Sequence, residues 1–186
     1  MTIFTEITPN PATLKFVVEG QVFLAKGTAD FPDFAAIGDR SELATRLFDF
    51  KFVAGVMIGY NFITVTKDPA FKWEEMIPKV KELIRDYVAS GQIVVQPLKE
   101  SAEDLLSDSE DSDIVKKIKG LLDDNIRPAV AMDGGDITFE SFEDGVVKLK
   151  LKGSCAGCPS STMTLKMGIE GMLTRFIPEV KTVEAV

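Results

Sequence analysis

The pattern of apolar and polar positions in the first half of the chain predicts three strands and two helices. Apolar runs predict strands over residues 13–18, 52–58 and 62–67. The second and third of these strands should form a hairpin around Gly59-Tyr60-Asn61. A helix is expected from the N-cap Ser41 through Phe48, and another over residues 73–89, where Pro78 must sit in an early turn or kink the helix.

The second half shows a different order of elements. A helix should begin near Asp113, with an apolar stripe at residues 114, 118, 121 and 122, and Pro128 should bend or end it. Residues 133–136 (DGGD) predict a turn, and strands over 137–142 and 146–152 should form a hairpin at Asp144-Gly145. A final helix should carry Leu165, Ile169, Met172, Leu173 and Phe176 on one face, stop at Pro178, and lead into an edge strand within 180–186.

An acidic segment separates these two groups of elements. Residues 96–112 contain one basic and six acidic side chains together with several serines, which is typical of an extended, solvated tether. The sequence therefore predicts an α+β protein with two small α/β-sandwich domains, residues 1–95 and 113–186, joined by a flexible linker over 96–112.

Composition narrows the function. The net charge is −8 and no Lys/Arg cluster offers a surface for phosphates, so nucleic acid is not expected as a partner. No apolar run is long enough to span a membrane, and the N-terminal residues lack the features of a targeting segment, which makes the cytoplasm the expected location. The chain has no histidine, which excludes Ser–His–Asp and Cys–His catalysis and every His-ligated metal site.

The two cysteines, Cys155 and Cys158, are the candidate site. They lie in Gly153-Ser154-Cys155-Ala156-Gly157-Cys158, and the next residue, Pro159, is favoured in the first turn of a helix. The unpaired N–H groups and positive dipole end of that helix would favour thiolates, the form that binds metal. Both cysteines are therefore predicted to be metal ligands.

Two thiolates supply only half of the usual ligand set. Zinc and iron–sulfur clusters normally take four ligands, so the missing pair must come from another copy of the chain. Asp133 and Asp136 would be unsuitable partners for a soft cluster. Thiol–disulfide exchange and a zinc site between subunits remain alternatives, and a structural disulfide is the least favoured.

The segments around the cysteines resemble a known family. Arg127-Pro128, residues 133–136, residues 153–161 and Ile177-Pro178-Glu179-Val180 resemble the C-terminal domain of NifU and the Nfu proteins, and residues 8–11 (TPNP), 14–16 and 62–67 resemble the Nfu N-terminal domain. The resemblance implies a non-enzymatic scaffold or carrier that holds a [4Fe–4S] cluster between two subunits, although two such motifs could also hold [2Fe–2S]. It also implies a homodimer or higher oligomer as the holo form, upstream cluster assembly proteins and recipient apo iron–sulfur proteins as partners, and only Cys155 and Cys158 as ligands.

Overall fold

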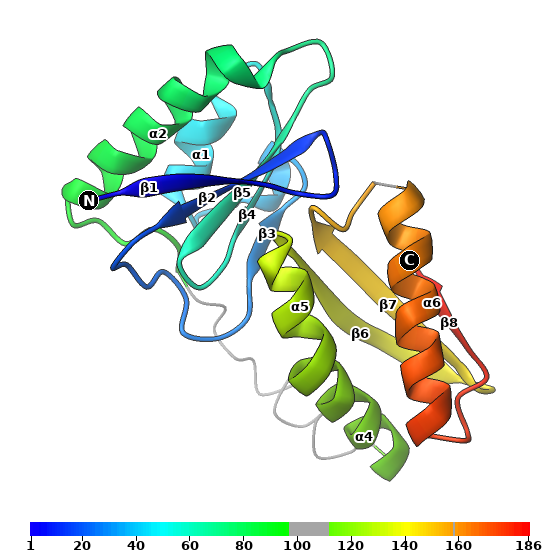
Figure 1. Cartoon of the computed structure of the whole chain (residues 1–186). Coiled ribbons are helices and arrows are strands. Elements are labelled where there is room, and N and C mark those ends of the chain that lie inside the picture. Colours follow the sequence, from blue (N-terminus) through cyan, green and yellow to red (C-terminus); the bar gives the residue numbers. More distant parts are fainter. Residues whose placement is uncertain (97–111, 158) are drawn as a thin grey trace.

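The computed structural model describes residues 1–96, 112–157 and 159–186, with the side chains of residues 159–162 outside that description. These residues form two domains, each with its own sheet and its own hydrophobic core (Figure 1). The α+β class predicted from the sequence is confirmed. The predicted linker falls mostly outside the described residues, and the exact domain boundaries stay a prediction. Within the described residues, no helix is both long and apolar enough to cross a membrane.

The N-terminal domain is a five-stranded antiparallel sheet with two helices on one face (Figure 1). The strand order is β1-β2-β5-β4-β3. The elements are β1 (Ile3–Ile7), β2 (Thr13–Val18), β3 (Ala29–Phe31), a 3-10 turn (Phe34–Ala36), α1 (Glu42–Phe48), β4 (Val53–Ile58), β5 (Phe62–Lys67) and α2 (Trp73–Ala89). Every strand and helix predicted in this half is present, while β1 and β3 were not predicted.

Local signals account for the positions of both helices. The hydroxyl of Ser41 accepts a hydrogen bond of 3.0 Å from the Ala44 N–H and so caps α1, as predicted. Pro78 lies in the second turn of α2, early enough for the helix to continue beyond it. The buried side chains of α2 recur at helical spacing and pack on the sheet: Met76, Val80, Ile84 and Tyr87.

The C-terminal domain has a three-stranded sheet of order β6-β7-β8. Its elements are α4 (Asp113–Leu121), a π-helical turn (Leu122–Ile126), α5 (Arg127–Met132), β6 (Gly135–Glu143), β7 (Val146–Gly153), α6 (Pro159–Phe176) and β8 (Thr182–Ala185). The hairpin at Asp144-Gly145 is confirmed, with both residues at positive φ. β8 is the predicted last strand and pairs with β7 in parallel.

Two details of this domain differ from the predictions. The first helix does not end near Pro128, because a π-helical turn comes directly before α5 and Pro128 falls in the first turn of α5, where its missing N–H costs little. Phe176 was expected on the apolar face of α6, but it is 62% exposed because the helix ends there. The other predicted members of that face are buried or half-buried: Leu165, Ile169, Met172 and Leu173.

The sheet face without helices in the N-terminal domain is covered by the C-terminal domain. Lys15 on β2, Met57 on β4 and Thr64 on β5 lie outside the N-terminal core, yet all three are buried. The Lys15 ammonium donates to the carbonyl of Met132 at 3.0 Å, and the Thr64 hydroxyl donates to the carbonyl of Gly134 at 2.8 Å. The start of β6 and the end of β7 therefore face the N-terminal sheet, which brings the cysteine loop to the boundary between the domains (Figure 1).

Candidate metal centre

Cys155 lies in the turn that connects β7 to α6. Two glycines with positive φ, Gly153 at 58° and Gly157 at 74°, let the main chain reverse on either side of it. The turn is anchored to the opposite loop, because the Ser154 N–H donates to the Gly134 carbonyl at 3.1 Å and the Ser154 hydroxyl donates to the Asp133 carbonyl at 2.6 Å. The loop before the helix is thus held in a defined conformation, and α6 begins at Pro159 as predicted.

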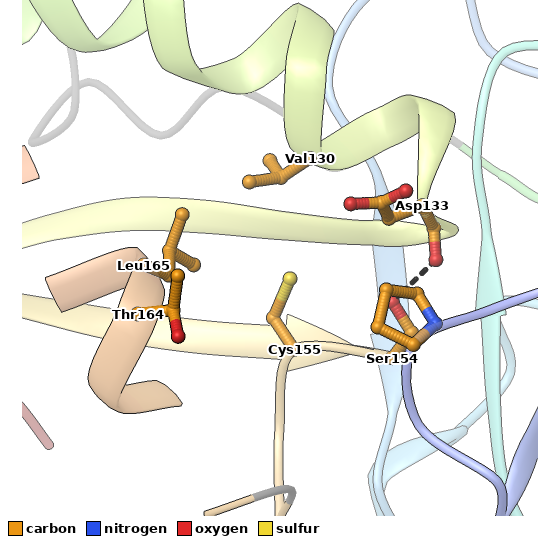
Figure 2. A pocket seen from close by; sticks show the side chains of 7 residues that line it. Val130, Asp133, Ser154, Cys155, Thr164 and Leu165 are labelled. Atoms are coloured by element: carbon orange, nitrogen blue, oxygen red, sulfur yellow. Dashed lines mark hydrogen bonds between the residues drawn. The ribbon is translucent and has the colours of Figure 1, made fainter. Parts of the chain in front are cut away.

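The side chain of Cys155 points into a cavity of about 370 Å³ (Figure 2). Val130 from α5 and Leu165 from α6 form its apolar walls, while Asp133 and Thr164 add oxygen atoms. Only 7% of Cys155 is exposed. The sulfur is therefore directed into a recess rather than onto an open surface.

Gly135 shows how closely the main chain approaches this sulfur. A Cβ atom placed on Gly135 would lie 2.3 Å from the Cys155 Sγ and 3.1 Å from the Cys155 main-chain N. No side chain other than hydrogen fits there without displacing the cysteine. The second glycine of the 133–136 segment thus preserves the space of the sulfur, while the first, Gly134, supplies the positive φ of the predicted turn.

The N-terminal domain contributes directly to the same loop. Asn10 is buried, and its side-chain NH₂ donates to the carbonyls of Ser154 at 3.3 Å and Ala156 at 3.1 Å. Pro9, the preceding residue, lines the cavity that receives the Cys155 side chain. Sequence analysis treated residues 8–11 as a turn before a strand and missed this contribution.

A buried acid also lies beside the loop. Asp30 on β3 accepts a hydrogen bond from the Gly153 N–H, and Lys152 and Lys150 are the nearest opposing charges. Burial raises the pKa of Asp30 above its ordinary value, and the lysines and the hydrogen bond offset only part of that effect. This carboxylate comes from the N-terminal domain and contacts the main chain two residues before Cys155.

The described residues of one chain do not form a complete metal site. Within them, no three His, Cys, Asp or Glu side chains gather where they could hold one metal ion. Asp133 lines the cavity, but Asp136 points elsewhere and pairs with Arg127. Cys158 lies outside the described residues, so its predicted role as the second ligand stays a prediction.

These features are typical of proteins that bind metal through thiolates. A cysteine at the start of a helix, turned into a recess and flanked by glycines, can supply a thiolate to a soft metal centre. The ligand shortage within one chain is the distinctive property of the site.

Comparison with known proteins identifies the family. The model "Scaffold protein Nfu/NifU N terminal" matches residues 3–91, and the model "NifU-like domain" matches residues 118–184. A human relative, "NFU1 iron-sulfur cluster scaffold homolog, mitochondrial", is 47% identical over 100% of this chain and 72% of its own length. A relative of the same name from Drosophila willistoni is 46% identical over 100% of this chain and 64% of its own length. The chain belongs to the Nfu family of iron–sulfur cluster scaffold proteins.

The lengths of these relatives and one solved structure complete the comparison. This chain spans about two thirds of the length of the curated relatives it matches, 64% for one fly relative and 65% for another. The solution structure of a NifU-like protein from Saccharomyces cerevisiae is 26% identical, with a TM-score of 0.47, and covers 52% of this chain and 85% of that one.

Proposed function

We propose that two copies of this chain hold one [4Fe–4S] cluster between them and pass it to recipient apo iron–sulfur proteins. Each copy would contribute Cys155 and Cys158, so that four thiolates bind four irons. The cluster is cargo in this proposal, and the chain is a carrier rather than an enzyme. The named relatives are iron–sulfur cluster scaffold homologs, which supports the scaffold role.

The incomplete ligand set is the observation that carries the proposal. The sequence contains two cysteines and no histidine, and the described residues bring no third ligand toward Cys155. The cavity beside Cys155 leaves room for a bound group, and Gly135 keeps that side of the sulfur clear. Because a cluster needs four thiolates, a second copy is the simplest source of the other two.

The burial of Cys155 disfavours thiol–disulfide exchange. In that chemistry the attacking sulfur must reach a disulfide on another protein, which requires an accessible thiolate. At 7% exposure, Cys155 is poorly placed for this attack. A zinc site of four thiolates between two copies uses the same ligands, so metal analysis must separate it from the cluster.

Anaerobic reconstitution with iron and sulfide tests the proposal. We expect a brown protein with about four irons per pair of chains, together with a doubling of the mass in solution. Cys155→Ser should abolish cluster binding, whereas Asp133→Asn should retain it, because that carboxylate lines the cavity without serving as a ligand. A full cluster in the Cys155→Ser variant would refute the site, and robust insulin reduction by the metal-free protein would favour the oxidoreductase.

Partners and location are part of the proposal. We expect transfer to recipient apo iron–sulfur proteins and loading by upstream assembly proteins, with no nucleic acid and no membrane as partners. The cytoplasmic location predicted from the sequence stays a prediction, and the relatives named above are labelled mitochondrial.

A further inference from the structure

We propose that Asn10, from the N-terminal domain, is a positioning residue for the loop that carries Cys155. This inference rests on the proposed function, because it assigns the N-terminal domain a part in the cluster site itself. The N-terminal domain would then help to hold the ligand loop.

The hydrogen bonds of Asn10 bracket the cysteine. Its NH₂ group donates to the carbonyls of Ser154 and Ala156, the residues on either side of Cys155. Both donors of the amide are used, and both acceptors are main-chain atoms whose position fixes the course of the loop. Only the nitrogen of the amide can face two carbonyls, so the orientation of the side chain is determined by its partners.

Asn10 is itself held rigidly. Its side-chain oxygen accepts from the Ala12 N–H at 3.0 Å, which forms an Asx turn. Its main-chain carbonyl accepts from the Thr8 hydroxyl at 2.8 Å and from the Thr13 N–H at 2.9 Å. These bonds attach Asn10 to the start of β2, so the N-terminal sheet acts as a fixed base for the cysteine loop.

Pro9 places the same segment at the cavity. It lines the recess into which the Cys155 side chain points, together with residues of α5 and α6. The N-terminal domain therefore supplies a wall of the recess as well as the hydrogen bonds that hold the loop. Without the Asn10 bonds, the loop would lose its tie to the N-terminal sheet on both sides of Cys155.

An aspartate at position 10 separates two roles of the side chain. Asn10→Asp keeps an oxygen that can accept from the Ala12 N–H, so the turn is preserved. It also removes both donors and places a carboxylate oxygen opposite two carbonyls, which repels the loop. If Asn10 served only its own turn, this variant would behave like the unchanged protein.

The first measurement uses metal-free full-length chain in which Cys158→Ser leaves Cys155 as the single thiol. The rate of alkylation by iodoacetamide reports how firmly the loop is held. We expect Asn10→Asp and Asn10→Ala to raise that rate about tenfold, since two hydrogen bonds are lost. Thr28→Val is the matched control, because it removes a different hydrogen bond between the domains, Thr28 to Asp136, and should change the rate by less than about twofold.

Urea unfolding of each variant shows whether a faster rate is local. We expect the Asn10→Asp rate to exceed what its change in global stability explains. Equal alkylation rates in Asn10→Asp and the parent, or rates that merely follow global stability as in Thr28→Val, would overturn the proposal.

The second measurement uses the protein with both cysteines, reconstituted anaerobically. A ferrous chelator should remove iron from Asn10→Asp about tenfold faster than from the unchanged protein, as expected for a loosened ligand loop. Equal release would overturn the assignment of Asn10 to the cluster site. If the unchanged protein binds no cluster, the proposed function fails, and the alkylation result still decides whether Asn10 holds the loop.

Discussion

Arg127 holds the buried carboxylate of Asp136 through two hydrogen bonds, of 3.0 and 3.1 Å. Thr28, from the other domain, donates to the same carboxylate at 2.6 Å, and the Ile137 N–H donates at 2.8 Å. The hydrogen bonds to Asp136 also raise the pKa of Arg127. An acid that the sequence placed beside the cysteines thus has a structural task, in which it joins α5, β6 and the N-terminal domain.

Replacing this acid should destabilise the protein. Asp136→Asn keeps the shape of the side chain but removes the charge that Arg127 and Thr28 contact. We expect the free energy of unfolding to fall by about 2 kcal/mol, because hydrogen bonds between charged groups are lost at a buried position. Urea denaturation followed by circular dichroism measures the change.

An exposed ion pair provides the control for this variant. Glu42 and Arg46 form an i,i+4 pair on α1, with both side chains about half exposed. Glu42→Gln should cost less than about 0.5 kcal/mol, since such surface pairs are weak. Similar losses in the two variants would contradict the structural role of Asp136.

Gly153 predicts a second, larger effect. A Cβ atom there would lie 2.7 Å from the Gly134 carbonyl oxygen and 2.7 Å from the Met57 side chain of the N-terminal domain. Gly153→Ala therefore combines a left-handed φ of 58° with two collisions, and should cost about 3 kcal/mol or more.

The matched control has the strain without the collisions. Gly20 has a φ of 75°, and nothing lies within 4 Å of its added Cβ. Gly20→Ala should cost about 1 kcal/mol from backbone strain alone. Equal unfolding free energies for the two alanine variants would mean that the packing of Gly153 against Met57 does not contribute.

Asp30 predicts a dependence of stability on pH. Burial raises its folded pKa above the unfolded value, so the folded protein binds more protons than the unfolded chain between those two values. Stability from this group is fully present below the unfolded pKa and is lost as the pH rises through the folded pKa. Asp30→Asn should therefore be more stable than the unchanged protein at neutral pH.

This advantage should disappear in acid. As the pH falls below the ordinary pKa of an aspartate, about 3.9, both proteins are uncharged at position 30 and their unfolding free energies should converge. Urea unfolding across this pH range measures the difference. A gap that stays constant with pH, or a less stable Asn variant at neutral pH, would contradict the cause assigned to the shift.

Local patterns predicted most of the fold. The hairpins at 59–61 and 144–145 follow from turn residues between alternating strands, and α2 follows from helical spacing ended by Gly91. β1 was missed because only Ile3 among its five residues is buried, so it has no clear alternation. β3 was missed because three residues are too few to show a period.

The candidate site was predicted only in part. The glycines, the proline at the helix start and the ligand count pointed to the cysteine loop, and the structure places Cys155 there. The contribution of Asn10 was not predictable, because its partner Ala156 is 146 positions away and an Asn between two prolines reads as a turn. Burial of Lys15 and Thr64 likewise depends on the other domain, since alternating polar residues predict a solvated sheet face.

The N-terminal domain touches the opposite domain mainly through main-chain oxygens near the cysteines. The acceptors for Asn10, Lys15 and Thr64 are all carbonyls, those of Met132, Gly134, Ser154 and Ala156. Carbonyl groups are the same in every residue, so this interface recognises the path of the backbone rather than the identity of its side chains. Domains from different family members should therefore be interchangeable in chimaeras, provided that the glycines shaping that path are retained.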